Sequence, residues 1–233
     1  MAKSVATPYR GVLLDALGTL VELQPPAPRL RKALRELAGV DVGEEAAAKG
    51  FAAEIAHYRA NHLRGGDEAG LDALRDDCAA VLREALGEAL GEPRLDAATV
   101  RRAMLEALEF RAYPDAPPAL RALSARGVRL VVASDWDCSL PYWLARTGLA
   151  ELLDGAVSSA VVGEAKPSPA VFRAALEIAG VSPAQALHVG DSVDKDVAGA
   201  RAAGLRAVLM ARDGLASDGV EAIRSLEELT SLI

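Results

Sequence analysis

Two aspartates lie far apart in the chain, and each follows a short apolar run. Asp15 follows the run 11–14, and Asp191 follows the run 186–190. If the two runs are neighbouring strands of one parallel sheet, both carboxylates reach the same edge of that sheet. Carboxylates crowded at one edge repel each other, which favours a bound cation or a shared proton. The pattern therefore predicts a nucleophilic site assisted by a metal ion.

Asp15 is the candidate nucleophile, because a turn at Gly18 and Thr19 would expose its attacking oxygen. Asp191 would bind the metal, and Asp196 would lie in the metal site or close behind it. A small set of hard oxygen ligands suits Mg²⁺, which keeps several waters. Each acid also has a purely structural interpretation: Asp15 as a turn residue, and Asp191 as the cap of a following helix.

Ser134 and Lys166 are the candidate groups for holding the part of the substrate that is transferred. Ser134 ends the apolar run 128–133, and its hydroxyl and the N–H groups after it could hold a phosphate oxygen. Lys166 lies in a proline-rich loop, where its ammonium could neutralise both Asp15 and a phosphoryl group. Asp135 follows directly as a further candidate for substrate contact. The alternatives are a helix-capping serine and a solvated lysine.

Alternating strand and helix patterns fill most of the chain outside one segment. The predicted strands are 11–16, 128–133, 155–159, 186–190 and 206–210, and the predicted helices are 118–126, 140–147, 170–179, 196–203 and 226–232. This alternation predicts an α/β fold with a parallel sheet covered on both faces. The candidate residues come at or just past the carboxyl ends of these strands, where such sheets place their sites.

The exception is residues 24–111, where helical spacing prevails and almost no strand signal is present. One helix face there carries Leu30, Leu34 and Leu37, and another carries Leu71, Leu74, Cys78 and Leu82. The proline-bearing segments 25–28 and 113–118 bound this region, and we interpret them as its linkers. The sequence thus predicts an all-helical domain, 24–111, inserted into a core formed by 1–23 and 112–233.

The four chemical stretches, taken in order, form a more specific pattern than any of them alone. They read strand-DxxGT, strand-S, loop-KP and strand-GDSxxxD, starting at Asp15, Ser134, Lys166 and Gly190. This order resembles the haloacid dehalogenase-like (HAD) hydrolase superfamily, subfamily I, over nearly the whole chain. The resemblance implies a Rossmann-like core, with the insert as a small helical cap. The two proline linkers imply that this cap opens and closes over the site.

The resemblance also implies roles for individual residues. Asp15 matches the nucleophile of the family, and the residues matching Ser134 and Lys166 bind the transferred group. Mg²⁺ is held by the acid matching Asp191 and by the backbone carbonyl two residues after the nucleophile, here Leu17. Thr19 matches a hydroxyl residue of the same turn. The implied activity is Mg²⁺-dependent hydrolysis of a small phosphorylated metabolite through an aspartyl-phosphate.

Leu17 departs from the phosphatase pattern, in which a second aspartate at this position serves as general acid and base. Leucine can offer its backbone carbonyl to Mg²⁺ but cannot carry a proton. General acid–base help contributes roughly 10²–10⁴-fold. An alkyl phosphate should therefore turn over slowly, whereas an activated aryl or acyl phosphate needs less help. Asp135, Asp137 or a residue of the insert could supply the proton instead.

Two other functions stay open. The dehalogenase branch of the superfamily also lacks the second aspartate, since halide leaves without a proton, but it uses no metal and lacks the metal-binding acid. This chain keeps Asp191 and Asp196, whose charges would repel a carboxylate substrate. A 2-haloacid dehalogenase is therefore the alternative enzyme. The second alternative is a non-catalytic member of the superfamily that binds a phosphorylated ligand or a protein.

Within the insert, His62 and Arg64 could reach the site and read the substrate. We favour the simpler interpretation of a solvated helix end, because basic residues are favourable there and two glycines follow. Trp136 and Trp143 are interpreted as packing residues. The sequence does not identify the substrate or the oligomeric state.

Composition narrows the class of protein. The chain has 233 residues, 51% of them hydrophobic and 25% charged, with a net charge of −7, which argues against nucleic acid as a partner. No apolar run is long enough to span a membrane. Met1 to Ser4 lacks the apolar stretch of a secretory signal and is expected to be a short frayed tail. Cys78 and Cys138 lack metal-type spacing and are expected to be reduced thiols in a cytoplasmic protein.

Overall fold

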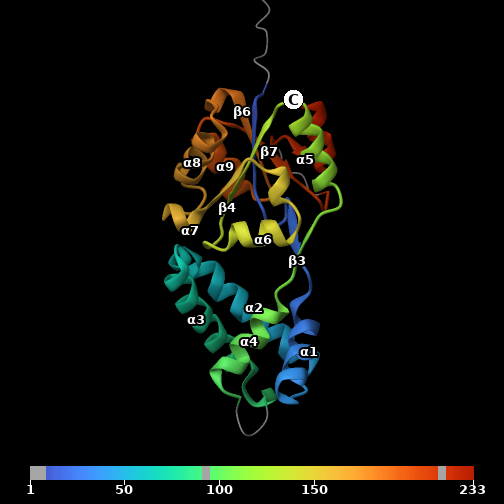
Figure 1. Cartoon of the computed structure of the whole chain (residues 1–233), viewed down its shortest axis with the longest axis vertical. Helices are drawn as coiled ribbons and strands as arrows, with labels where there is room; N and C mark the ends of the chain where they lie inside the picture. The colour runs from blue at the N-terminus through green and yellow to red at the C-terminus, as the bar shows by residue number, and fades with distance from the viewer. Residues whose placement is uncertain (1–8, 91–94, 215–218) are drawn as a thin grey trace, which may run out of the picture. The chain divides into compact units, whose positions relative to one another are not determined.

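The computed structural model of the chain describes residues 9–90, 95–214 and 219–233 and divides into two compact units. An α/β unit combines Met1–Glu22 with Ala112–Ile233, and a helical unit comprises Leu23–Arg111 (Figure 1). Each unit has its own buried apolar cluster. The segment Met1 to Ser4, expected to be a frayed tail, lies outside the described residues.

The α/β unit is built on one six-stranded parallel sheet in the order β5-β4-β1-β6-β7-β8. Its strands are β1 (Gly11–Leu14), β4 (Arg129–Ser134), β5 (Gly155–Ser158), β6 (Ala186–Gly190), β7 (Arg206–Met210) and β8 (Ala222–Ile223). The predicted Rossmann-like α/β fold is confirmed. The two-residue strand β8 was not predicted, because it is too short to show a period.

Helices cover both faces of this sheet. They are α5 (Ala116–Ala125), α6 (Leu140–Arg146), α7 (Ser159–Val162), α8 (Pro169–Ala179) and α9 (Ala198–Ala202), with 3₁₀ turns at Ala150–Leu152, Pro183–Gln185 and Leu226–Ser231. Figure 1 shows α8 and α9 on one side of the sheet and α5 on the other. Both faces are therefore buried, which explains why β1 and β6 are apolar throughout apart from His188.

The segment after β6 differs from the prediction. We predicted a single helix over 196–203, but a π-helical turn spans Val193–Val197 before α9 begins. Ser192 starts this turn, and its side-chain oxygen accepts a hydrogen bond from the N–H of Lys195. The predicted C-terminal helix 226–232 is likewise a 3₁₀ helix, Leu226–Ser231. Both differences concern the hydrogen-bond spacing of a short turn, which side-chain periodicity does not report.

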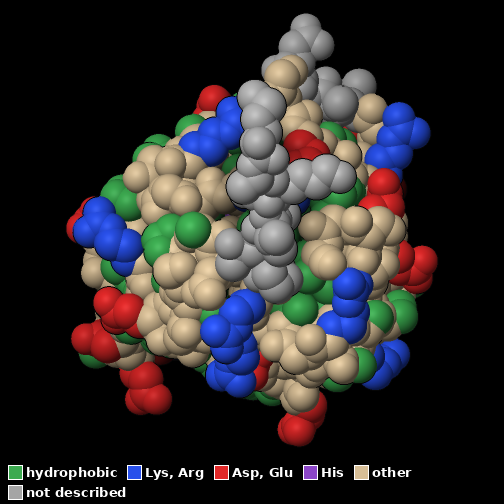
Figure 2. All heavy atoms as spheres, turned by 90° about the horizontal axis from the view of Figure 1, so that it is seen from above, with side chains coloured by type: hydrophobic (Ala, Val, Ile, Leu, Met, Phe, Trp, Pro, Cys, Tyr) green, Lys and Arg blue, Asp and Glu red, His purple; other side chains and the backbone are tan. Residues whose placement is uncertain are grey.

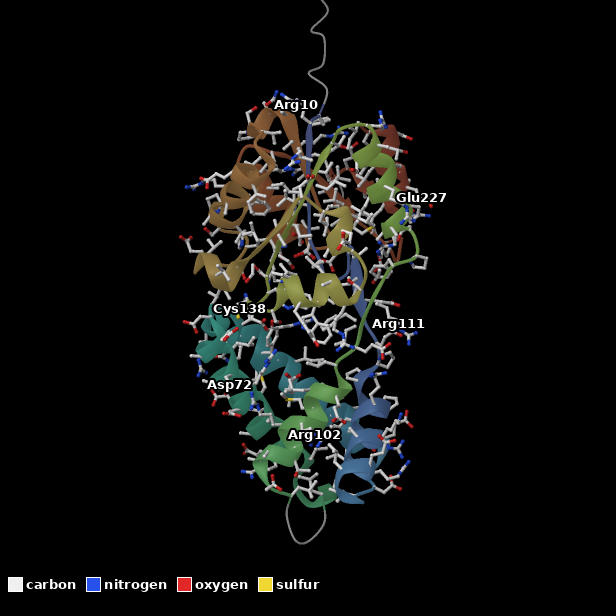
Figure 3. All side chains as sticks on the ribbon, in the orientation of Figure 1. Arg10, Asp72, Arg102, Arg111, Cys138 and Glu227 are labelled. Carbon is white, nitrogen blue, oxygen red and sulfur yellow. The ribbon has the colours of Figure 1, made fainter. Side chains whose placement is uncertain are left out.

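The helical unit packs four helices around one core: α1 (Pro26–Ala38), α2 (Glu44–Asn61), α3 (Glu68–Leu86) and α4 (Ala97–Ala107). Short 3₁₀ turns occupy His62–Gly65 and Gly87–Leu90. The faces predicted from helical spacing are the buried ones, except that Leu37 is only partly buried. Charged side chains such as Asp72 and Arg102 point outward (Figure 3).

The prediction that the proline segments are linkers is wrong. Pro26 opens α1 and the prolines after Ala116 lie in the first turn of α5. A helix tolerates proline there because its first N–H groups have no partner within the helix. The chain passes between the two units through β2 (Val21–Leu23) and β3 (Phe110–Ala112), which pair as a two-stranded sheet.

Among the described residues of the helical unit, one carboxyl group is buried. Glu54 of α2 is 5% exposed, and burial raises its pKa from 4.5 to about 7, with a hydrogen bond from the Cys78 side chain opposing the shift. The folded protein therefore keeps Glu54 protonated at pH values where the unfolded chain ionises. As the pH rises from about 4.5 to 7, Glu54 should lower the free energy of unfolding by roughly 3 kcal/mol.

We expect Glu54→Gln to remove this pH dependence. The variant and the native chain should have similar free energies of unfolding near pH 4, and the variant should be the more stable above pH 7. Urea unfolding of both proteins at a series of pH values measures the difference. A difference that stays constant across this range would contradict the assignment.

Candidate active site

The parallel register places Asp15 at the centre of the carboxyl edge of the sheet. Strand β1 lies between β4 and β6, with Leu14 level with Val132 on one side and Val189 on the other. The N–H of Asp15 continues the ladder by donating to the carbonyl of Val189 at 2.8 Å. The next residues of both neighbouring strands therefore flank Asp15, as the sequence pattern predicts.

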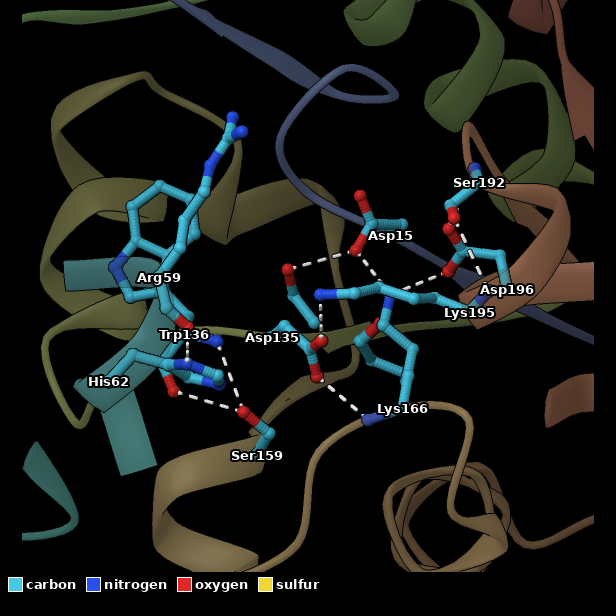
Figure 4. A network of polar contacts seen from close by, with 12 residues as sticks. Asp15, Arg59, His62, Asp135, Trp136, Ser159, Lys166, Ser192, Lys195 and Asp196 are labelled. Atoms are coloured by element: carbon cyan, nitrogen blue, oxygen red, sulfur yellow. Dashed lines mark hydrogen bonds and ion pairs between the residues drawn. The ribbon is translucent and has the colours of Figure 1, made fainter. Parts of the chain in front are cut away.

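Asp15, Ser134 and Lys166 lie in direct contact (Figure 4). The Ser134 hydroxyl donates to Oδ1 of Asp15 at 3.0 Å, and the Lys166 ammonium donates to the same oxygen at 2.5 Å. Asp15 is 5% exposed; burial raises its pKa, while the Lys166 charge opposes the rise. Both bonds converge on Oδ1, so Oδ2 is the oxygen that stays available for chemistry.

The ammonium of Lys166 is shared between two carboxylates. Its Nζ lies 2.5 Å from Oδ1 of Asp196 as well as 2.5 Å from Asp15, and it also donates to the carbonyl of Ala133 at 3.2 Å. Burial alone would lower the pKa of Lys166, but the two carboxylates raise it above its ordinary value. Lys166 therefore stays charged, at the start of a cis Lys166–Pro167 peptide bond.

Asp191 completes a cluster of three carboxylates. One oxygen from each of Asp15, Asp191 and Asp196 lies within 4.8 Å of the others, with Asp191 exposed. Partial burial, followed by the charges of Asp15 and Asp196, raises the pKa of Asp191 to about 6. A divalent cation would relieve this repulsion, and the all-oxygen donor set suits Mg²⁺. The residues therefore fit the predicted metal.

Gly18 allows Asp191 to approach the turn of Gly18 and Thr19, which follows β1 and which we name the Gly18 turn. Gly18 has φ +86°, and a β-carbon there would lie 2.1 Å from Oδ2 of Asp191. Only glycine therefore allows both the turn and the contact. The N–H groups of this turn donate to the carbonyls of Ala16 and Val21, and none of these bonds uses the carbonyl of Leu17. Metal binding by that carbonyl stays a prediction.

Thr19 and Asp135 belong to the segments that carry this cluster, and their side chains differ in their contacts. Thr19 is fully buried, with its hydroxyl unpartnered among the described residues. Asp135 accepts from the N–H of Lys166 at 2.9 Å and from the ammonium of Lys195 at 3.0 Å. Asp135 thus ties the loop of Lys166 to the segment after β6. Substrate contact by either residue stays a prediction.

An arginine outside the predicted motifs holds the Gly18 turn through its backbone carbonyls. Arg212, two residues after β7, donates to the carbonyls of Gly18 at 3.2 Å and Thr19 at 2.6 Å. It also pairs with Asp115 at 3.1 Å and stacks 3.6 Å from the ring centroid of Tyr113. The turn is therefore fixed to the segment that leads into α5.

The same Asp115 oxygen accepts two further hydrogen bonds, from the Ser225 hydroxyl at 3.0 Å and the N–H of Leu226 at 2.8 Å. The pKa of Asp115 lies below its ordinary value, because Arg212 and these donors outweigh burial, which acts to raise it. We name Arg212, Asp115, Ser225 and Leu226 the arginine clamp. It joins the Gly18 turn to the segment of Ser225 and Leu226.

His62 and Arg64 belong to the 3₁₀ turn between α2 and α3. The Nδ1–H of His62 donates to the carbonyl of Arg59 at 3.0 Å, and Arg64 pairs with Asp77 of α3 at 2.7 Å. These contacts lie within the helical unit. Arg64 is exposed, as a solvated helix end predicts, but His62 is only 7% exposed, so that interpretation is wrong for His62. Substrate recognition by His62 and Arg64 stays a prediction.

Sequence reasoning missed His188, whose Nε2 lies 2.9 Å from Oδ1 of Asp196. A polar residue in the middle of a predicted buried strand was the available signal. It also missed Arg212, for which no local signal exists, because its partners Asp115 and Gly18 lie 97 and 194 residues away in sequence.

Comparison with known proteins identifies related chains. A sequence model of haloacid dehalogenase-like hydrolases matches residues 9–204. A protein of Mycobacterium tuberculosis, Phosphatase MT3486, is 34% identical over 70% of this chain and 77% of its own length. Phosphoserine phosphatase of Thermus thermophilus is 38% identical over 61% of this chain. The chain spans well under two thirds of some curated relatives, 57% of the Thermus protein and 37% of a bovine one.

Solved structures share the fold. A 2-haloacid dehalogenase from Pseudomonas syringae pv. Tomato superposes with a TM-score of 0.63 at 26% sequence identity, over 96% of this chain and 97% of that chain. Phosphatases and a dehalogenase thus both stand among the similar proteins. The choice between the phosphatase and the dehalogenase reaction therefore depends on the residues at the carboxyl edge of the sheet.

Proposed function

The chain belongs to the haloacid dehalogenase-like hydrolases, and from this premise we propose that it is a Mg²⁺-dependent phosphatase for a small phosphorylated metabolite. The observation that carries the proposal is the three-carboxylate cluster beside a buried lysine. A cation site and a nucleophile then share one sheet edge. The phosphatases among the similar proteins support the same reaction class.

Asp15 carries out the first step. Its Oδ2 attacks phosphorus, the bond from phosphorus to the leaving oxygen breaks, and an aspartyl-phosphate forms. Ser134 and Lys166, which both contact Oδ1, lie where they can also donate to the oxygens of the transferred group. Water then attacks phosphorus, which releases phosphate and restores the Asp15 carboxylate.

The residues that would hold Mg²⁺ are Asp15, Asp191 and the backbone carbonyl of Leu17, with Asp196 close behind. When bound, the ion supplies positive charge that polarises the phosphoryl group. Lys166 neutralises the rest of the negative charge on the phosphoryl group. Asp15 and Asp196 keep the Lys166 ammonium protonated, because their charges raise its pKa.

In this site, Leu17 and Asp135 are poorly suited to donate a proton to the leaving oxygen. Leu17 has no ionisable group, and Asp135 is engaged by Lys166 and Lys195. We propose that the enzyme therefore favours substrates whose leaving group needs little protonation, such as aryl or acyl phosphates. We also propose that 24–111 serves as the cap over the core formed by 1–23 and 112–233.

A 2-haloacid dehalogenase is the second candidate, favoured by the similar structure from Pseudomonas. Leaving halide needs no proton, so Leu17 would not hinder that reaction. A carboxylate substrate would, however, meet the Asp15, Asp191 and Asp196 cluster, with only Lys166 as a buried countercharge among the described residues. The phosphatase reaction therefore fits this charge arrangement better.

Partners of the site are expected to be small molecules. The face shown in Figure 2 mixes Lys and Arg with Asp and Glu, and its described residues gather no patch of one sign. In the described part of the chain, no helix combines the length and the low polarity that crossing a bilayer requires. We also propose a cytoplasmic location, because Cys78 and Cys138 are expected to be reduced thiols.

A substrate screen with separate readouts for phosphate and chloride tests the proposed function. Phosphorylated metabolites, p-nitrophenyl phosphate and 2-chloropropionate are each incubated with the protein, with and without Mg²⁺. We expect Mg²⁺-dependent phosphate release and no chloride release. Chloride release would establish the dehalogenase. No turnover, together with a rise of the unfolding temperature on adding inorganic phosphate, would indicate a non-catalytic binding protein.

Replacing one ligand tests the metal site. We expect Asp191→Asn to raise the Mg²⁺ concentration for half-maximal activity by at least about tenfold, because the site loses a charged oxygen ligand. Asp194→Asn, an exposed acid of the same loop, is the matched control and should leave the Mg²⁺ titration unchanged. Equal titration curves for Asp191→Asn and the native chain would place the metal elsewhere.

A further inference from the structure

A histidine is buried at the centre of the α/β unit, behind the candidate active site. His188 lies in β6 and is 1% exposed. Its ring meets the edge of Phe172 from α8, with centroids 4.9 Å apart and planes at 89°. Its Nε2 lies 2.9 Å from Oδ1 of Asp196. The ring thus has an apolar neighbour and a carboxylate neighbour.

The surroundings of His188 determine its tautomer. Asp196 forms an ion pair with the ammonium of Lys166, whose Nζ lies 2.5 Å from its Oδ1. An ionised carboxylate only accepts hydrogen bonds, so Nε2 must carry the proton. Nδ1 is buried and has no partner among the described residues, which suits a bare lone pair better than an N–H.

Asp196 is held on several sides at once. Its Oδ1 accepts from His188 and Lys166, and its Oδ2 accepts from the N–H of Ser192 at 3.0 Å. A β-carbon on Gly190 would lie 2.2 Å from Cγ of Asp196, so the carboxyl group rests directly on the end of β6. These contacts leave Asp196 little freedom to turn.

We infer that His188 is a positioning residue that fixes the Asp196 carboxylate and, through it, the ammonium of Lys166. This inference rests on the proposed function, in which Lys166 serves the transferred phosphoryl group. The contacts form a continuous line from the core to the nucleophile: 2.9 Å from His188 to Asp196, and 2.5 Å from Asp196 to Lys166. Lys166 then lies 2.5 Å from Asp15.

With Asp196 held in place, the ammonium of Lys166 is shared between Asp15 and Asp196. An ammonium with a single carboxylate partner in a buried site pairs tightly with it, which would weaken Asp15 as a nucleophile. Because Asp196 competes for the same ammonium, Lys166 stays available to the incoming phosphoryl group. A carboxylate that lost the His188 bond could turn away from Lys166, and Asp15 would then be the carboxylate with which the ammonium pairs.

Two substitutions of His188 separate positioning from packing. His188→Leu keeps an apolar side chain against Phe172 but removes the donor to Asp196, so we expect kcat for p-nitrophenyl phosphate to fall about 10–100-fold with little change in KM. His188→Gln can still donate from its amide and should restore most of kcat. Equal kcat values for native protein and His188→Leu would overturn the inference.

Two further variants test the route through Asp196. In an Asp196→Asn background, His188→Leu should cause little additional loss of kcat, because its effect passes through the residue already changed. Phe172→Leu is the packing control, since it alters the other neighbour of the ring and leaves the Asp196 bond in place. It should lower the unfolding temperature and leave kcat nearly unchanged. Fully independent losses from His188→Leu and Asp196→Asn would contradict the proposed route.

A readout independent of activity keeps this inference separate from the proposed function. Nitrogen-15 NMR of the native protein should show His188 protonated at Nε2 and bare at Nδ1. The opposite tautomer would refute the positioning role even if phosphatase activity were found. Conversely, absence of phosphate release by the native protein would refute the proposed function while the predicted tautomer was still observed. Because this measurement uses the native chain, it holds even if His188→Leu fails to fold.

Discussion

Asp15→Asn is expected to lower hydrolysis of p-nitrophenyl phosphate by at least about 10³-fold. An amide oxygen cannot form the aspartyl-phosphate, so the residual rate would come from binding and from the charge of Lys166. The fold should tolerate the change, because Lys166 keeps Asp196 as a carboxylate partner. Initial rates of p-nitrophenol release at saturating Mg²⁺ measure the effect.

A carboxylate-to-amide change elsewhere in the same unit controls for general damage. Glu221→Gln alters an exposed acid that pairs with Arg206, far in sequence from the motifs of the site, and should leave the rate unchanged. Thermal unfolding of both variants shows whether they are folded. If a folded Asp15→Asn protein kept its activity, Asp15 would not be the nucleophile.

Leu17→Asp is expected to have the largest effect in the opposite direction. A carboxyl group at this position can pass a proton to the leaving oxygen, which should raise turnover of alkyl phosphates by roughly 10²–10⁴-fold. Turnover of p-nitrophenyl phosphate should rise much less, because p-nitrophenolate leaves without protonation. The informative quantity is the ratio of kcat/KM for an alkyl phosphate to that for p-nitrophenyl phosphate.

Leu17→Asn is the matched control, since it has nearly the shape of aspartate and no proton to donate. It should leave this ratio near the native value. An unchanged ratio in Leu17→Asp would mean that another group already supplies the proton or that chemistry does not limit turnover. Asp135 would be a poor candidate for that group, because both its oxygens accept hydrogen bonds.

The contacts at the sheet edge could be predicted because each depends on a local pattern. Asp15, Ser134 and Asp191 each directly follow a buried apolar run, and parallel strands bring their carboxyl ends together whatever lies between them. The ion pair of Lys166 with Asp15 agrees with the neutralisation proposed from sequence. The roles of these residues in catalysis stay predictions.

Other features depend on information that no local pattern contains. The proline segments were interpreted as breaks, although proline also opens helices, and only the packing of α1 and α5 decides between these uses. Strands β2 and β3 have three residues each, too few for a period to emerge. Arg212 contacts residues from two distant segments, so its partners follow only from the complete fold.

The arginine clamp gives Ser225 and Leu226 a part in holding the turn of Gly18 and Thr19. Ser225 and Leu226 supply two of the hydrogen bonds that orient Asp115, and Asp115 in turn steadies the guanidinium behind Gly18 and Thr19. Shortening the chain before Ser225 would therefore loosen the turn that carries Leu17. A chain shortened before Ser225 for crystallisation would keep every sequence motif. Its Gly18 turn would nevertheless be poorly ordered, because Asp115 and Arg212 would lose part of their support.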